Sequence, residues 1–187
     1  MVFLAATLAV AVAVGVSGFE PKEAVASTDD NTVRTCPSSD PVDPPLSSDE
    51  KRILDLQNQA RTSRGKPALC VHSALTDAAR AHSQDMLNRE YFSHTSPDGE
   101  TVKQRLESSG YTFNRSSYYA YGENIAWGAG SPYATADYLF KGWMQSKQHK
   151  RNILKDDFRE VGIGVKTGTY KTYNDVTMAT VDFGVRR

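Results

Sequence analysis

The chain has 187 residues, and its 22 Lys and Arg balance 22 Asp and Glu, so the formal net charge at pH 7 is +0. A neutral chain lacks the basic character that nucleic acids and anionic membrane surfaces attract, and we expect neither as a partner. A charged fraction of 24% and a hydrophobic fraction of 39% are typical of a soluble globular protein, and the length suits one domain with extensions.

The first 26 residues have the pattern of a signal peptide. Residues 2–16 are almost wholly Ala, Val, Leu and Phe, too short a run to span a bilayer but suited to a signal-peptide core. Ala24-Val25-Ala26 then supplies a small-residue cleavage pattern. Because no Lys or Arg precedes the apolar run, an uncleaved anchor stays an alternative. We predict secretion with removal of residues 1–26, and no stable membrane span.

The two cysteines, Cys36 and Cys70, fit an extracellular location. A secreted chain with an even number of cysteines usually pairs them, so we predict a disulfide. It would close a loop of about 35 residues and contribute roughly 3 to 4 kcal/mol to stability. Residues 27–47 are rich in Pro, Ser and Asp and are predicted to form an extended segment, which the disulfide would fasten to the domain.

Two helices are predicted at the start of the domain. Ser47 with Glu50 three residues later forms a capping-box pattern, and this helix should continue to about Arg61. A second helix is predicted over residues 74–89. Its apolar side has helical spacing and comprises Leu75, Ala78, Ala79, His82 and Met86.

A turn and two further helices follow. Ser96-Pro97-Asp98-Gly99 is a turn sequence, in which glycine takes the left-handed position. A short helix is predicted from Val102 to Ser108, ended by Gly110. Ser131-Pro132 predicts another helix through Met144, with serine as the cap and proline at the first helical position.

Strands are predicted between and after these helices. Residues 118–127 are aromatic and apolar, and residues 161–165 and 176–183 are β-branched and alternating. Gly168 and Asn174-Asp175 lie between the last two strands, as in a hairpin. Helices gathered first and strands later predict the α+β class.

Three short clusters carry most of the functional information. They are Phe92-Ser93-His94, Gly122-Glu123-Asn124-Ile125 and the run from Trp143 to His149. Together they offer two imidazoles and one carboxylate to a single cleft, which is the composition of a divalent-metal or acid/base site.

A series of motifs runs along the domain. In chain order they are Asn58 and Arg61, Ala81-His82-Ser83-Gln84-Asp85-Met86, Phe92-Ser93-His94, Ser96-Pro97-Asp98-Gly99, Gly122-Glu123-Asn124-Ile125-Ala126, Trp143-Met144, His149-Lys150-Arg151-Asn152-Ile153-Leu154 and Val161-Gly162-Ile163-Gly164. In this order they resemble the CAP (SCP/Tpx-1/Ag5/PR-1) superfamily in its bacterial extracellular form, and the resemblance covers residues 48–187.

The resemblance implies a three-layer α-β-α sandwich with a central antiparallel sheet and a cleft. In many members of the superfamily, two His and two Glu line this cleft and can hold zinc. By position, His94, Glu123 and His149 match three of the four. Ser146 stands where animal and plant members have the second glutamate, so the full tetrad is not present.

His94, Glu123 and His149 could bind zinc or another divalent cation with one coordination position left open to water. Structural roles compete with this interpretation. The histidines could instead form hydrogen bonds that fix the ends of helices, and Glu123 could form a buried ion pair. Glu123, His149 and Ser146 also permit a serine-hydrolase interpretation, although no nucleophile-elbow sequence of the G-x-S-x-G kind is present.

Other residues have simpler predicted roles. We expect His82, Trp143 and Phe92 in the core, and Asn124 as a hydrogen-bonding residue that shapes the cleft. Asn114-Arg115-Ser116 is formally a glycosylation sequon, whose use is not expected in a chain with bacterial motifs.

The function that we favour from sequence is a secreted, non-enzymatic and monomeric module. Its cleft would bind an apolar small molecule, a lipid or a cell-envelope component. The cleft residues would be His94, Glu123, Asn124, Ser146 and His149. The alternative is an extracellular peptidase, metal-dependent or serine-type, that uses the same cleft, and a third possibility is that exposed faces bind a partner protein.

Overall fold

The computed structural model describes residues 33–37, 39–113 and 118–186. The predicted signal peptide and the sequon at residues 114–116 lie outside these ranges. Within them, no helix has both the length and the apolar character needed to cross a membrane.

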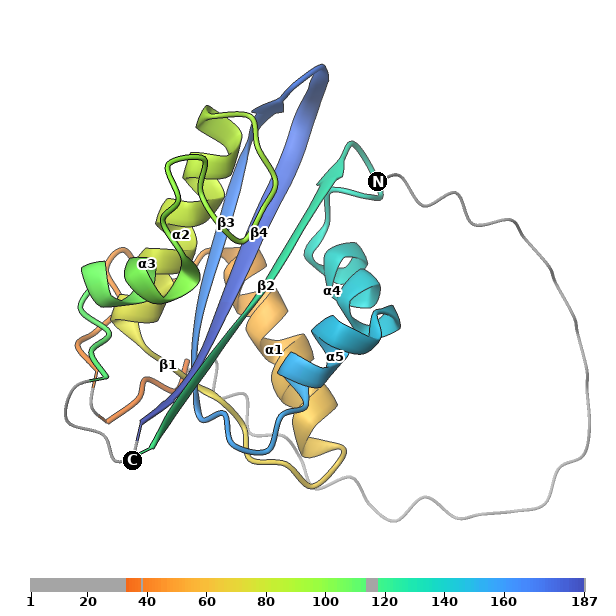
Figure 1. Ribbon diagram of the computed structural model, residues 1–187. Helices are drawn as coiled ribbons and strands as arrows, with labels where there is room; N and C mark the ends of the chain where they lie inside the picture. The colour runs from red at the N-terminus through yellow and green to blue at the C-terminus, as the bar shows by residue number, and fades with distance from the viewer. Residues whose placement is uncertain (1–32, 38, 114–117, 187) are drawn as a thin grey trace, which may run out of the picture. The chain divides into compact units, whose positions relative to one another are not determined.

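A four-stranded sheet forms the centre of the domain, in the order β1-β3-β4-β2 (Figure 1). Its long strands are β2 (Tyr119–Ala129), β3 (Glu160–Tyr170) and β4 (Tyr173–Arg186), and they pair antiparallel. The two-residue strand β1 (Cys70–Val71) joins β3 in parallel. The predicted strands are therefore confirmed, and each is longer than its sequence pattern indicated.

The predicted position of the hairpin turn is wrong. The chain reverses between Tyr170 and Tyr173, which pair with each other, while Gly168 remains in β3 opposite Val176. A two-residue hairpin loop requires positive φ, and Lys171 supplies it with φ 54°. Because Lys171 is neither glycine nor asparagine, the usual sequence signal was missing.

Helices cover both faces of the sheet. On one face lie α2 (Ser73–Asn88) and α3 (Val102–Ser108) (Figure 1). On the other lie α1 (Ser48–Thr62), α4 (Ala136–Gln145) and α5 (Lys147–Ile153). This is the predicted three-layer α-β-α sandwich.

Close packing joins α2 to β3. An added Cβ at Gly162 would lie 2.0 Å from the Leu75 carbonyl carbon, and one at Gly164 would lie 2.2 Å from that of Ala79. Only glycine allows the helix backbone to approach the strand this closely.

Helix boundaries follow their capping residues. The capping box of Ser47 and Glu50 begins α1 as predicted, and a second box of Thr101 and Gln104 begins α3. The predicted start of the fourth helix is wrong, because α4 begins at Ala136 with Thr135 as its cap. Residues 131–134 instead form a turn whose Ala134 N–H donates to the Gly130 carbonyl and whose Ala134 carbonyl accepts from Thr177.

Core predictions are confirmed for His82 and Trp143, each 1% exposed. Trp143 also donates its indole N–H to the Ile125 carbonyl of β2, at 3.1 Å. The core prediction for Phe92 is wrong, because its side chain is 40% exposed. Phe92 lies after α2 ends, where no helix or strand packs it into the interior.

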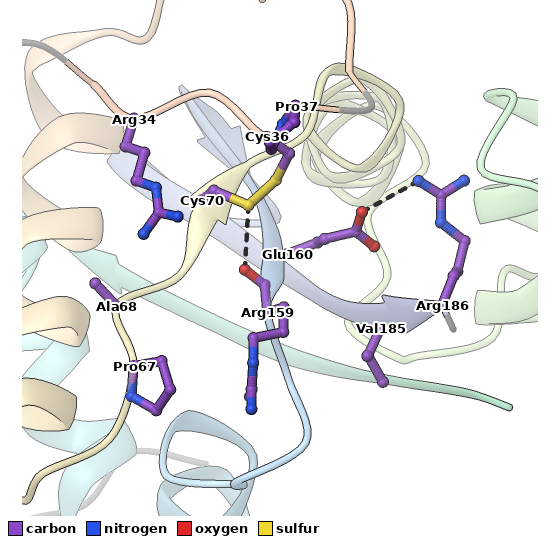
Figure 2. A pocket seen from close by; sticks show the side chains of 10 residues that line it. All are labelled: Arg34, Cys36, Pro37, Pro67, Ala68, Cys70, Arg159, Glu160, Val185 and Arg186. Carbon is purple, nitrogen blue, oxygen red and sulfur yellow. Dashed lines mark hydrogen bonds and ion pairs between the residues drawn. A yellow bond between two sulfur atoms is a disulfide. The ribbon is translucent and has the colours of Figure 1, made fainter.

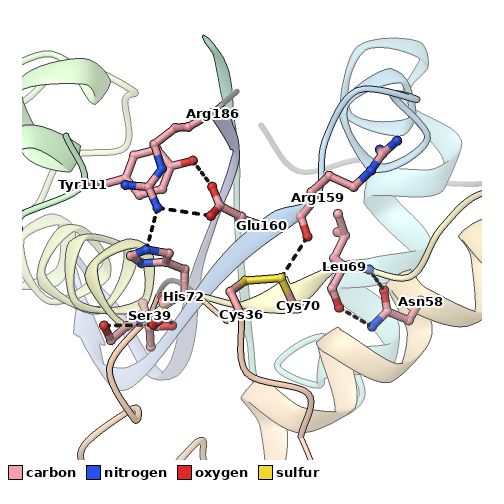
Figure 3. Close-up of a disulfide and its surroundings, with 12 residues drawn as sticks. Cys36, Ser39, Asn58, Leu69, Cys70, His72, Tyr111, Arg159, Glu160 and Arg186 are labelled. Atoms are coloured by element: carbon pink, nitrogen blue, oxygen red, sulfur yellow. Dashed lines mark hydrogen bonds and ion pairs between the residues drawn. A yellow bond between two sulfur atoms is a disulfide. The ribbon is translucent and has the colours of Figure 1, made fainter. Parts of the chain in front are cut away.

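The predicted disulfide between Cys36 and Cys70 is present (Figure 3). The segment before it runs beside β1, because Thr35 forms a parallel bridge to Val71 and the Cys36 N–H donates to the Val71 carbonyl at 2.8 Å. The lead segment is thus fastened to the sheet by covalent and backbone bonds together.

Candidate functional site

Glu123 lies at the centre of the candidate site, in the middle of β2. Glu123 is 6% exposed, and each of its carboxylate oxygens has a side-chain partner. Oε1 lies 2.6 Å from Nδ1 of His94, and Oε2 accepts a hydrogen bond of 2.7 Å from Arg105. Burial alone would raise the pKa of Glu123, but the His94 hydrogen bond and the Arg105 charge lower it below its usual range. The carboxylate is therefore ionised at neutral pH.

Arg105 fixes the loop that carries His94. It extends from the short helix α3 and is 6% exposed. Besides Glu123, its guanidinium donates to the His94 carbonyl at 2.9 Å and to the Glu100 carbonyl at 3.2 Å. One buried cation thus joins the loop after α2 to the edge strand β2.

His94 is the exposed member of the group. Its side chain is 49% exposed, in contrast to 1% for the side chain of Glu123. Because an ionised carboxylate only accepts hydrogen bonds, Nδ1 of His94 must donate, and this fixes the orientation of the ring. The other ring nitrogen, Nε2, is then available to a ligand.

His82 lies next to Glu123 in the core and is a neutral histidine. Its Nε2 lies 3.1 Å from the Ser93 carbonyl and 3.9 Å from Oε2 of Glu123. Burial lowers the pKa of His82 to about 4, against the opposing influence of Glu123. The prediction that His82 is structural is therefore confirmed.

Asp182 is a buried acid that sequence analysis missed. It lies on β4 directly opposite Glu123 and is 1% exposed. No hydrogen bond of ordinary geometry links its carboxyl oxygens to another described residue. Burial, with the negative charge of Glu123, raises the pKa of Asp182 well above its usual range. Burial and the charge of Glu123 thus favour the protonated form of Asp182 beside an ionised neighbour.

The remaining predicted residues lie on α5 and its contact with β2. Asn124 is fully buried and donates to the His149 carbonyl at 3.1 Å. Asn152 donates to Oδ1 of Asn124 at 2.9 Å and to the Glu123 carbonyl at 3.2 Å. The hydrogen-bonding role expected of Asn124 is confirmed. Asn152 adds a second amide to this network, and although it belongs to one of the sequence motifs, no role was predicted for it.

His149 is half-buried on α5, and burial together with electrostatic repulsion from the His94 ring lowers its pKa. It is therefore neutral at pH 7. Ser146 caps the helix and accepts from the His149 backbone N–H at 3.5 Å. This bond involves the backbone of His149 and not its ring, so the serine serves as a cap in this structure and not as an activated nucleophile.

The three predicted metal ligands are brought together only in part. His94 and Glu123 are in contact, whereas no ion pair joins His149 to Glu123. Across residues 33–37, 39–113 and 118–186, no group of three or more His, Cys, Asp or Glu is arranged to hold a metal ion. With both oxygens of Glu123 occupied, one by a cation, the donor set does not fit a three-ligand site.

Comparison with known proteins supports the resemblance. The sequence model of the family described as "CAP: Cysteine-rich secretory protein family" matches residues 54–183. The chain is 36% identical over 143 residues to the uncharacterized protein YkwD of Bacillus subtilis, covering 76% of this chain and 50% of YkwD. It is 34% identical over 121 residues to the uncharacterized membrane protein YlbC of the same species, covering 65% of this chain and 32% of YlbC. The chain thus spans half or less of these relatives.

Solved structures show the same fold. An extracellular protein containing an SCP domain from Bacillus anthracis matches with a TM-score of 0.59 and 29% identity, over 76% of this chain and 45% of that one. An outer surface protein from Borrelia burgdorferi matches with a TM-score of 0.61 and 21% identity, over 74% of this chain and 93% of that one.

Proposed function

This chain belongs to the CAP family of cysteine-rich secretory proteins, and from this premise we propose that its domain is an extracellular, non-enzymatic ligand-binding module. We include in the proposal the removal of residues 1–26 as a signal peptide. One similar structure is described as extracellular and another as an outer surface protein, and both support this location. The ligand that we propose is an apolar small molecule, a lipid or a cell-envelope component with a polar group that His94 can bind.

The buried, doubly hydrogen-bonded state of Glu123 is the observation that carries the proposal. A general base or nucleophile needs a lone pair that can reach the substrate. Each carboxylate oxygen of Glu123 already accepts one hydrogen bond, from His94 or Arg105, and the side chain is only 1% exposed, so its other lone pairs do not reach solvent. A carboxylate held in this way orients its histidine, and the exposed ring of His94 then offers Nε2 to a hydroxyl or amide of a ligand.

A divalent metal is not part of this function, because the donor set does not fit one. Calorimetric titration of the chain with zinc tests that statement. Tight binding at one equivalent, lost in H94A and in H149A, would contradict it.

The binding proposal is tested with a fluorescent long-chain fatty acid and with isolated cell-wall material as probes. We expect H94A to bind at least one of the probes about tenfold more weakly, since a hydrogen bond to a ligand contributes roughly 1 kcal/mol or more. K141A, an exposed change on α4, is the matched control and should bind normally. Equal binding of both probes by H94A and wild type would overturn the proposal.

The competing hydrolase hypothesis is tested on the same proteins. Wild type, H94A, E123A and H149A are assayed on a panel of peptides and esters, with and without chelator. We expect no turnover in any of them. Turnover by wild type that disappears in all three folded variants would show that the cleft is an active site.

A further inference from the structure

A cavity lies beside the disulfide, apart from the candidate site. Its volume is about 390 Å³ (Figure 2). None of the candidate-site residues His94, Glu123 and His149 lines it. Its polar lining is dominated by three arginines, namely Arg34, Arg159 and Arg186, with Glu160 as the one acidic residue.

The cavity is built by parts of the chain that are distant in sequence. Arg34 belongs to the lead segment, and its carbonyl accepts from the Val71 N–H at 2.8 Å. The disulfide next to it holds this segment against β1. Arg159 immediately precedes β3 and Arg186 ends β4, so Figure 2 shows the arginines arranged around the cavity from three different segments.

The charge in the cavity is unbalanced. Glu160 is already bound, since it pairs with Arg186 at 3.1 Å and accepts a hydrogen bond from Tyr111 (Figure 3). Among the residues that the structure describes, no carboxylate forms an ion pair with Arg34 or Arg159. Among the described residues, these two arginines of the lining thus form no direct ion pair, and Asp156 acts on Arg159 only at longer range.

One of these two guanidinium groups is also held in place. Arg159 donates to the Phe158 carbonyl at 2.9 Å and to the Asp156 carbonyl, and both bonds come from the same nitrogen, Nη1. Within the described part of the chain, Nε and Nη2 of Arg159 form no hydrogen bond, and a guanidinium fork of this kind matches the oxygens of a phosphate or carboxylate group.

We propose that this cavity binds a phosphate group through Arg34 and Arg159. A phosphomonoester carries a charge of about −1.5 to −2 at neutral pH and three acceptor oxygens, which matches two unpaired guanidiniums. A carboxylate carries only one charge and would leave one guanidinium unbalanced. This inference does not depend on the proposed function of the His94 site.

Isothermal titration calorimetry of the whole purified chain tests the proposal, with inorganic phosphate, glycerol phosphate and acetate as probes. R34Q is the first variant, because Arg34 is exposed and its replacement should leave the fold intact. R34Q/R159Q is the second. K141Q removes one positive charge from α4, outside the lining, and is the matched control.

We expect phosphate to bind wild type and K141Q alike, about tenfold more weakly to R34Q, and more weakly still to R34Q/R159Q. Added NaCl should weaken binding, because exposed charges are screened. Tighter binding of glycerol phosphate than of inorganic phosphate would assign an ester as the ligand, and the reverse would assign free phosphate. No phosphate binding to wild type, equal binding to all variants, or acetate bound as tightly as phosphate would overturn the proposal.

Discussion

Glu123 and Asp182 face each other across β2 and β4, so two buried carboxyl groups occupy one cross-strand pair. Like charges directly opposite are destabilising in a sheet, and desolvation adds to the cost. The pair is tolerated because Arg105 and His94 bind Glu123, while burial favours the protonated form of Asp182. With the ionised form of Glu123 and the protonated form of Asp182 favoured, the pair avoids two like charges side by side.

Replacing Asp182 by Asn should stabilise the protein at pH 7. The raised pKa of Asp182 means that the folded state binds a proton that the unfolded state releases, so stability falls as pH rises above the unfolded value of 3.8. Asn has no proton to lose and can donate to Glu123. Urea unfolding should show D182N more stable than wild type at pH 7 by on the order of 1 kcal/mol, with a smaller difference at pH 4.

D77N, an exposed change on α2, serves as the control and should behave like wild type at both pH values. A D182N difference that stays constant with pH would mean that Asp182 does not hold its proton in the folded state.

Loss of Arg105 should destabilise the fold strongly. Removing one member of a buried ion pair leaves the other charge unpaired, which costs about 3 to 5 kcal/mol. We therefore expect R105Q to lose stability in this range in urea unfolding, because Glu123 then loses its arginine partner and keeps only the histidines His94 and His82 as basic neighbours among the described residues.

The double variant R105Q/E123Q provides the control for this prediction. Because it removes both charges, its loss should be clearly smaller than the sum of the two single losses. Additive losses would show that the two side chains do not interact.

Features that depend on residues close together in the chain, such as helix starts, were partly predictable from the sequence. The capping box of Ser47 and Glu50 lies within one helical turn, and it placed the start of α1 correctly. The Ser131-Pro132 pattern was just as local but was overridden, because the turn after β2 uses its backbone groups for bonds to Gly130 and Thr177. A local signal fails where a contact from a distant segment competes for the same backbone groups.

The candidate site was predictable as a set of residue types but not as a set of bonds. Motif order singled out His94 and Glu123, which are in contact. The residues that decide their chemistry, Arg105 and Asp182, reach Glu123 from α3 and from the neighbouring strand. Their contribution depends on strand register and on helix placement, and neither leaves a pattern in the sequence. An acid between apolar residues in β4 was the one available signal for Asp182.

Two glycines provide a test of the packing between α2 and β3. G162A should destabilise the protein by several kcal/mol, because its Cβ would lie 2.0 Å from the Leu75 backbone and would force the helix away from the strand. G142A on α4 meets no atom within 4 Å and should stabilise by about 0.5 to 1 kcal/mol. Thermal unfolding of both variants checks the contrast, and equal effects would refute it.

His82 should make the protein sensitive to acid. Its pKa lies at about 4 in the folded state, below the 6.5 of a free imidazole, so the unfolded state binds a proton more readily between these values. The contribution of the neutral His82 to folding stability is therefore fully present above pH 6.5 and is lost as the pH falls toward 4. The shift corresponds to a loss of about 3 kcal/mol at most.

We expect urea unfolding at pH 7 and pH 4.5 to show a larger drop for wild type than for H82Q. Carboxylates remote from residue 82 contribute equally to both proteins, so the difference between the two drops reports His82 together with its neighbours Glu123 and Asp85. If both proteins lose the same stability, His82 is not the group that titrates.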